Sequence, residues 1–296
     1  MIVRKHTSII EQSIRKLTEG ENARSVCVYS RNAKLLISQG DLKIIIDLAR
    51  SILFPGYFSS SHITTQTAMN QIGKHIERLY ELLSGQICAG LCFHTVEADY
   101  GECWDKAQEL ATRFISGMPD LRRMLETDVV ATYNGDPAAE SYGEVIYCYP
   151  AIRAISNYRI AHELLLLGVP IIPRMITEMA HSETGIDIHP AAKIGKAFTI
   201  DHGTGVVIGA TAIIGNQVKL YQGVTLGAKS FPLDANGNPI KGIPRHPIIE
   251  DDVIIYSNAT ILGRITIGKG AIIGGNLWVT EDVPPEGRVV QMKAKR

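Results

Sequence analysis

A step of six residues organises the second half of the chain. Aliphatic residues recur at every sixth position in two blocks that are separated by one interruption. The first block comprises Ile188, Ile194, Ile200, Val206, Ala212, Val218 and Val224, and the second Ile249, Ile255, Ile261, Ile267, Ile273 and Val279. An amphipathic helix would need steps of three and four, and an exposed hairpin would alternate in twos. The repeat therefore predicts a parallel β-helix, in which three hexads make one triangular coil and the aliphatic residues stack along its axis.

The interruption, residues 229–245, is rich in turn-forming residues. It contains the run Asp234-Ala-Asn-Gly-Asn-Pro239 and ends at Arg245, directly before His246. This composition predicts a loop extruded from the coil. Long loops on rigid scaffolds often carry binding residues, although a tolerated surface insertion would have the same composition.

The first half of the chain has a helical period instead. Its apolar residues predict helices near residues 9–17, 42–53, 64–83, 104–116, 118–132, 151–167 and 172–179. We expect the apolar faces of these helices to form core and subunit contacts. The expected class is therefore α+β, with an all-α N-terminal domain over 1–183, a β-helix domain over 184–283 and a C-terminal tail over 284–296. Pro284 and Pro285 are expected to end the last coil, because proline cannot donate to a strand ladder.

Composition narrows the partners and the compartment. The formal net charge is zero, so no charge excess points to nucleic acid or to an anionic membrane. We find no apolar run long enough for a membrane span and no apolar N-terminal block typical of a signal peptide. The 5 cysteines are irregularly spaced, as expected for reduced thiols in a cytoplasmic protein. Cys88, Cys92, His94 and Cys103 could form a zinc site, but without paired C-x-x-C spacing we favour buried free thiols.

One hexad carries polar residues where its neighbours carry small or aliphatic ones. Asp201 and His202 follow the core position Ile200, and glycines follow them. His202 alone could be an ordinary surface residue. Three hexads per coil would place Asp187 beside Gly205, three positions from His202 and within reach of its side chain. A carboxylate that holds one imidazole nitrogen makes the other a general base, suited to activating an alcohol.

Several separated motifs then occur in a recognisable order. They are Asp136-Pro-Ala138, Tyr158-Arg-Ile-x-His162, Asp187-Ile-His-Pro-Ala-Ala-Lys-Ile-Gly195, Asp201-His202-x-Thr204-Gly205, Val224-Thr-Leu-Gly227 and Arg245-His246-Pro247. On these motifs the chain resembles bacterial serine O-acetyltransferases over residues 136–285. The first 130 residues fit only the general plan of that family, which has an N-terminal helical domain.

The resemblance implies a left-handed β-helix and a reaction. The enzyme would transfer the acetyl group of acetyl-CoA directly to the L-serine hydroxyl, giving O-acetylserine for cysteine biosynthesis without a metal. The implied roles are general base for His202, its carboxylate partner for Asp187, and serine binding for Asp136, Asp201, Arg245 and His246. A guanidinium such as that of Arg245 can bind a carboxylate through two hydrogen bonds.

The resemblance also implies an assembly and a place for acetyl-CoA. In the family acetyl-CoA lies between adjacent β-helices of a trimer, and by position Ala228, Ser257, Gly274 and Gly275 would line that groove. Tight corners would explain these small residues equally well. A homotrimer or a dimer of trimers is expected.

The chain departs from the family pattern at two places. The segment 229–244 before Arg245 is longer than usual, which puts part of the acetyl-CoA environment in question. The chain ends Gln291-Met-Lys-Ala-Lys-Arg296, whereas family members that dock into O-acetylserine sulfhydrylase end in isoleucine. Docking to that partner is therefore not expected.

Three alternative functions remain open. Another hexapeptide-repeat O-acetyltransferase, acting on a sugar or xenobiotic hydroxyl, would keep His202 but would have little need of an amino-acid clamp. A β-helical zinc carbonic anhydrase could use His189, His202 and His246, although these lack the close histidine pair usual in such sites. A non-catalytic scaffold would not explain Asp187, Asp201 and His202 together.

Overall fold

The computed structural model describes residues 2–19, 36–58, 64–93 and 99–291. The chain divides into two compact units, Met1–Leu36 and Ile37–Arg296. The first unit contributes helix α1 (Ile2–Glu19). The apolar residues that predicted this helix are more than half exposed: Ile9, Ile10, Ile14 and Leu17. This face is therefore not buried within the single chain, and its role in subunit contacts stays a prediction.

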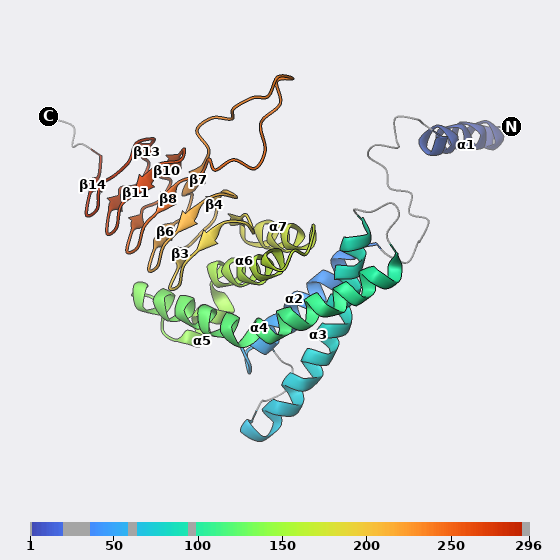
Figure 1. Ribbon diagram of the computed structural model, residues 1–296, viewed down its shortest axis with the longest axis horizontal. Helices are drawn as coiled ribbons and strands as arrows, with labels where there is room; N and C mark the ends of the chain where they lie inside the picture. Colours follow the sequence, from blue (N-terminus) through green and yellow to red (C-terminus); the bar gives the residue numbers. More distant parts are fainter. Residues whose placement is uncertain (1, 20–35, 59–63, 94–98, 292–296) are drawn as a thin grey trace. The chain divides into compact units, whose positions relative to one another are not determined.

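The second unit begins with a group of helices (Figure 1). They are α2 (Gln39–Leu53), α3 (Thr65–Phe93), α4 (Tyr100–Gly135), α5 (Tyr142–Cys148), α6 (Pro150–Leu166) and α7 (Ile172–Thr184). Helix α3 packs against α2 and α4, and α6 packs against α7. The helical period of the apolar residues did not predict α5. Ser141 caps this helix by accepting a hydrogen bond from the Glu144 amide. No helix among the described ranges is both long and apolar enough to cross a membrane.

Helix α4 corrects the expectation of two helices over 104–116 and 118–132. It runs without a break through Pro119. Its buried apolar stripe continues at helical spacing through that point, at Phe114, Met118, Leu121 and Leu125. Packing of this stripe against neighbouring helices outweighs the one backbone hydrogen bond that proline removes.

After α7 the chain forms a parallel β-solenoid (Figure 1). Its strands are β1 (Asp187–Ile188), β2 (Lys193–Ile194), β3 (Thr199–Asp201), β4 (Val207–Ile208), β5 (Ile213–Ile214), β6 (Lys219–Tyr221), β7 (Thr225–Gly227), β8 (Ile248–Ile249), β9 (Ile254–Ile255), β10 (Thr260–Leu262), β11 (Thr266–Ile267), β12 (Ile272–Ile273), β13 (Trp278–Val279) and β14 (Arg288–Val289). They form three sheets: a first sheet β1-β4-β7-β10-β13, a second β2-β5-β8-β11 and a third β3-β6-β9-β12-β14. The predicted α+β class is confirmed, while the left-handed sense of the coil stays a prediction.

The first coil is two residues longer than the predicted eighteen, and this corrects the predicted single register. Ile188 pairs with Ile208, twenty positions later, whereas Ile208 pairs with Leu226, eighteen positions later. The two extra residues fall between Ile200 and Val207, in the segment that contains His202. The predicted positions Val206, Ala212, Val218 and Val224 are buried, but each lies two residues before the buried strand residue of its hexad.

The two other departures from the repeat lie later in the chain. The loop 229–245 leaves the coil between β7 and β8 (Figure 1), and Leu233 and Pro239 form an antiparallel bridge within it. Pro284 and Pro285 do not end the last coil as predicted, because β14 follows them and pairs with β12. Both prolines lie between strands, where no ladder hydrogen bond is required of them.

Candidate active site

His202 lies at the corner between the third and first sheets, directly after β3. Its backbone has φ +56°, a left-handed conformation, and its side chain is 77% exposed. Gly203 has φ +101°, and Ile186 packs so closely against it that a Cβ would not fit. The two extra residues of the first coil and this strained turn therefore project His202 away from the solenoid.

Two carboxylates lie beside His202. Asp201 is the last residue of β3, and its Oδ1 is 3.7 Å from His202 Nε2. Asp136 follows α4, and its Oδ2 accepts a 2.6 Å hydrogen bond from the Tyr149 hydroxyl while its Oδ1 accepts from the Ala138 amide. The Tyr149 hydrogen bond is the main cause that lowers the pKa of Asp136, and the charge of His202 also lowers it. The hydrogen bond to Asp136 likewise raises the pKa of Tyr149 to about 12. Asp136 is therefore held as an anion and Tyr149 as a neutral donor.

Lys219 joins these carboxylates to the helices. Its Nζ lies 3.3 Å from Asp201 Oδ2 and donates a 2.8 Å hydrogen bond to the carbonyl of Gly135, at the end of α4. Burial lowers the pKa of Lys219, but the hydrogen bond with Tyr221 and the charge of Asp201 raise it, and the net direction is upward. A permanent cation thus fixes the end of α4, and with it Asp136, next to β3.

The corner that carries His202 continues through the later coils. Asp201 pairs with Tyr221, the rings of Tyr221 and Tyr256 stack at 4.9 Å, and Tyr256 precedes Ser257. Ser257 accepts a hydrogen bond from the Asn276 amide, and a Cβ on Gly275 would lie only 3.0 Å from the Ser257 carbonyl oxygen. We call this column, residues 201–205 with Gln222, Ser257, Gly274 and Gly275, the His202 corner. Three of the four residues predicted for the acetyl-CoA groove therefore share one edge with His202.

The other predicted residues lie at the corner between the first and second sheets. We call this group the His246 corner, and it comprises Gly209, Thr211, Ala228, Arg245, His246 and Arg264. His246 is only 6% exposed, and its ring lies over Gly209, where a Cβ would overlap it. His246 Nδ1 accepts a 3.1 Å hydrogen bond from the Thr211 amide, so the proton of the neutral ring is on Nε2.

Burial and nearby cations keep His246 neutral. Burial is the main cause that lowers the pKa of His246 to about 4, and the charges of Arg245, His189 and Arg264 lower it further. The Arg245 guanidinium lies 5.8 Å from the Phe231 ring of the extruded loop, and its Nε has no hydrogen-bond partner among the described residues. The corner thus presents a neutral donor beside a cation.

Asp187 lies between the two corners. It pairs with Val207, not with Gly205 as predicted, because of the two extra residues in the first coil. Its Oδ1 is 3.7 Å from Nη1 of Arg174 on α7. Among the described residues, neither a hydrogen bond nor an ion pair joins Asp187 to His202, so their pairing stays a prediction.

One chain does not bring the two corners together. They occupy opposite ends of the β4 side of the triangle, and His202 and Gly209 are seven residue steps apart, at most ~23 Å along the chain at ~3.3 Å per residue. Asp136, Asp201 and His202 therefore form one group, while Arg245 and His246 form another.

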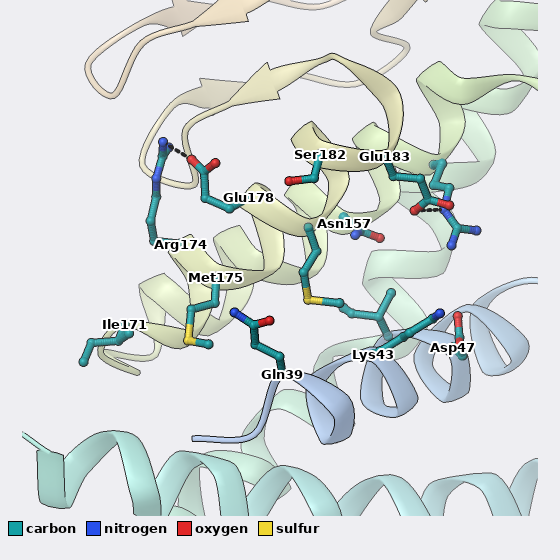
Figure 2. Close-up of a pocket in the computed structure, with 13 residues that line it drawn as sticks. Gln39, Lys43, Asp47, Asn157, Ile171, Arg174, Met175, Glu178, Ser182 and Glu183 are labelled. Carbon is teal, nitrogen blue, oxygen red and sulfur yellow. Dashed lines mark ion pairs between the residues drawn. The ribbon is translucent and has the colours of Figure 1, made fainter. Parts of the chain in front are cut away.

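A cleft of about 770 Å³ lies elsewhere, among α2, α6 and α7 (Figure 2). Arg174 on its wall pairs with Glu178 as well as with Asp187. None of the site residues predicted from the sequence lines this cleft. It is therefore separate from both corners.

Potential metal ligands gather at one place in the described part of the chain. Ligand atoms of Glu178, His181 and Asp187 lie within 4.8 Å of one another, whereas His189, His202 and His246 form no such group. The Arg174 guanidinium contacts both carboxylates. Its positive charge makes the position unfavourable for a cation.

The cysteine group behaves as free thiols. Burial is the main cause that raises the pKa of Cys88 and Cys92, and it raises the pKa of Cys103 to about 11. Burial therefore favours the protonated form of these three thiols at neutral pH. His94, the fourth residue of the group, lies outside the described residues.

Comparison with known proteins identifies the family of the chain. Residues 246–281 match the family described as bacterial transferase hexapeptide (six repeats). A plasmid-encoded serine acetyltransferase of Synechococcus elongatus is 48% identical over 265 residues, covering 88% of this chain and 83% of that protein. The chain belongs to the serine acetyltransferase family. It is thus an acyltransferase.

Solved structures of the serine acetyltransferase family match most of the chain. The Entamoeba histolytica serine acetyltransferase 1 in complex with L-cysteine is 36% identical, with a TM-score of 0.72, and the match covers 83% of this chain and 86% of that one. The soybean serine acetyltransferase complexed with serine is 31% identical, with a TM-score of 0.54, and the match covers 86% of this chain and 97% of that one. Both the helices and the solenoid therefore fall within the family fold.

Sequence reasoning missed residues that support the predicted ones. Lys219 on β6 pairs with Thr199 on β3, in the neighbouring coil. A charged residue one coil away from Asp201 was a signal that the sequence could have given. Gly209 and Thr211 hold His246, and Gly209 was visible only as one of many corner glycines. Tyr149 precedes the helix-starting Pro150 and belongs to no periodic pattern. Its role depends on the tertiary contact with Asp136.

Proposed function

We propose that this chain transfers the acetyl group of acetyl-CoA to the hydroxyl of L-serine, giving O-acetylserine and CoA. The observation that carries the proposal is the grouping of Asp136, at the end of α4, with Asp201 and His202 on the solenoid edge that also carries Ser257 and Gly275. Membership of the serine acetyltransferase family supports this choice of substrates. A sugar acetyltransferase would have no need for two carboxylates beside its base.

His202 is the proposed general base. Its exposure and its projecting backbone conformation leave the ring open to a substrate hydroxyl. The imidazole would take the proton from serine Oγ as Oγ attacks the thioester carbonyl carbon. The new C–O bond forms, the C–S bond breaks, and the departing CoA sulfur takes the proton from His202. Asp187 is the proposed carboxylate that orients the ring, in the role that the family resemblance gives it.

The serine itself would be held by opposite charges. Asp136 and Asp201 are the proposed partners of its ammonium group, and the Tyr149 hydrogen bond keeps Asp136 in the required anionic form. Arg245 is the proposed partner of its carboxylate, with the neutral His246 Nε2–H as a second donor. A donor at that position could also stabilise the oxyanion of the tetrahedral intermediate.

These two groups would meet only between two chains. The His202 and His246 corners lie at opposite ends of the β4 side of the triangle, so one serine would not reach both corners of a single chain. We therefore assign the complete site to the contact between the His202 corner of one subunit and the His246 corner of the next, as in a cyclic homotrimer. Acetyl-CoA would lie along this contact against Ser257, Gly274 and Gly275 on one side and Ala228 on the other.

The experiment measures release of the CoA thiol from acetyl-CoA with a panel of hydroxyl acceptors, for the native chain and for His202→Ala. We expect release with L-serine that disappears in His202→Ala. Release with sugars and none with serine would reject the substrate. A stoichiometric zinc content that the serine reaction requires would reject the metal-free mechanism.

A further inference from the structure

Tyr149 also lines a second cavity, whose lining includes neither Asp136 nor Asp201. Its volume is about 220 Å³, and it is lined by the end of α2, the segment from α5 to the start of α6, and the end of α7. Since water occupies ~30 Å³ per molecule in the liquid, the cavity has room for several waters or one small solute. It is smaller than the ~300 Å³ at which pockets for drug-sized ligands begin.

Arg50 gives this cavity an uncompensated charge. The side chain is only 3% exposed, and its Nε has no hydrogen-bond partner. No hydrogen bond from its guanidinium to another described residue is present, and its contact is with the Phe58 ring, at 4.6 Å. Burial lowers the pKa of Arg50 to about 10, and the charge of Arg153 lowers it further. The group therefore stays cationic at neutral pH, although a buried cation without hydrogen bonds is costly.

The other charges near the cavity leave Arg50 incompletely neutralised. Arg153 also lines it, and Glu183, labelled in Figure 2, pairs with Arg153. Glu183 is the single carboxylate among the described lining residues, and Asp47 reaches Arg50 electrostatically from the neighbouring cleft. Two guanidinium groups thus share one carboxylate within the cavity.

The start of α6 adds to the positive potential. Tyr149 and Pro150, the N-cap and first residue of this 17-residue helix, line the cavity, and no side chain caps the helix. A helix N-terminus carries a partial positive charge and free N–H groups that favour anions. The charge of the helix and that of Arg50 therefore act in the same direction.

We propose that this cavity is a binding site for one small oxyanion, sulfate, phosphate or a small carboxylate, held chiefly by Arg50 and Arg153. The anion would supply the acceptors that Arg50 lacks and would offset the two guanidinium charges. The proposal does not depend on acetyl transfer. Tyr149 separates this oxyanion cavity from the Asp136 group, since it lines both and its hydroxyl faces Asp136.

The test titrates the full-length chain with sodium sulfate, sodium phosphate and sodium acetate by calorimetry, with sodium chloride added to keep the ionic strength constant. We expect saturable binding of one oxyanion per chain, and comparison of the three salts identifies the preferred class. In a parallel thermal denaturation, a bound anion raises the midpoint along a saturation curve. Sulfate also stabilises proteins in general because it is excluded from their surface, but that rise of the midpoint would continue with sulfate concentration without saturating.

The variants separate this cavity from other cationic places. Arg50→Met keeps the side-chain volume and removes the charge, and it should weaken anion binding at least tenfold. Arg153 is partly exposed, so Arg153→Gln spares the core, and it should weaken anion binding several-fold. Lys43→Gln removes an exposed cation from the same helix α2 and should leave binding unchanged. Arg245→Gln at the candidate serine site should also leave it unchanged.

Two results would overturn the proposal. One is the absence of saturable binding in the native chain. The other is binding that survives in both Arg50→Met and Arg153→Gln but is lost in Arg245→Gln, which would place the anion at the candidate active site. Tyr149→Phe, which keeps the cavity wall, should bind the anion normally even if serine kinetics change, so the two functions can fail independently.

Discussion

The two histidine corners of the solenoid differ in almost every physical respect. His202 is 77% exposed, its backbone is left-handed, and its 3.7 Å approach to Asp201 is too long for a hydrogen bond. His246 is 6% exposed, its Nδ1 accepts from Thr211, and its pKa lies near 4 because of burial and neighbouring cations. A ring that must exchange protons needs access and a nearby carboxylate, whereas a ring that only donates needs a fixed tautomer. This difference supports the proposal that the two residues have separate tasks and that each corner supplies half of a site.

The largest expected effect is that of His202→Ala. Loss of a positioned general base lowers kcat by ~10²–10⁴-fold. The thermal midpoint should hardly move, because the side chain is exposed and makes no hydrogen bond that supports the fold. Steady-state kinetics and calorimetry on the same preparation check both parts. A variant that retains most of its kcat would remove His202 from the mechanism.

Gly209→Ala tests the opposite corner through packing. The new Cβ would overlap the His246 ring, so the ring must shift, and overpacking of this kind costs ~1–3 kcal/mol of unfolding free energy. We expect a lower denaturation midpoint together with a kcat/KM loss of about tenfold or more. Gly73→Ala in α3 is the matched control, since nothing lies within 4 Å of its new Cβ. Equal behaviour of the two variants would show that the position of His246 is unimportant.

Tyr149→Phe should have a smaller and more selective effect. It removes the 2.6 Å hydrogen bond to Asp136, so the pKa of Asp136 should rise towards its ordinary value. A carboxylate contributes as an anion above its pKa, and serine binding should therefore be lost at a higher pH in the variant as the solution is acidified. We expect the serine KM to rise several-fold with kcat little changed. An unchanged KM across the pH range would argue against Asp136 as a serine ligand.

The last prediction concerns how the unfolding free energy of the native chain depends on pH through His246. The folded pKa of His246 lies below the ordinary 6.5, so between pH 6.5 and pH 4 the unfolded chain binds the extra proton. This contribution is complete above pH 6.5 and is lost as the pH falls towards 4, amounting to at most ~3 kcal/mol. Urea unfolding of the native chain and of His246→Asn at several pH values measures it. The native chain should lose more stability over this window than the variant, and parallel curves would contradict the assignment.

The same comparison shows what the sequence could reveal. A repeat with period six determines which residues face the axis, so the solenoid and its interruption at 229–245 were predictable. The two extra residues before Val207 were not, because Val206 and Val224 are also buried aliphatic residues and concealed the shift. Motifs located His202, Arg245 and His246, but the corner that each occupies depends on register. The contact of Tyr149 with Asp136 joins two helix ends that share no sequence pattern.

The central claim is that the His202 corner of one subunit and the His246 corner of another form one site. The most direct measurement co-expresses His202→Ala and Arg245→Gln chains with different tags and assays oligomers that carry both. Each variant alone should be inactive, whereas about one site in three should be restored in doubly tagged cyclic trimers, because one of their three contacts combines an intact His202 corner with an intact His246 corner. Doubly tagged oligomers that stay as inactive as the single variants would contradict the claim.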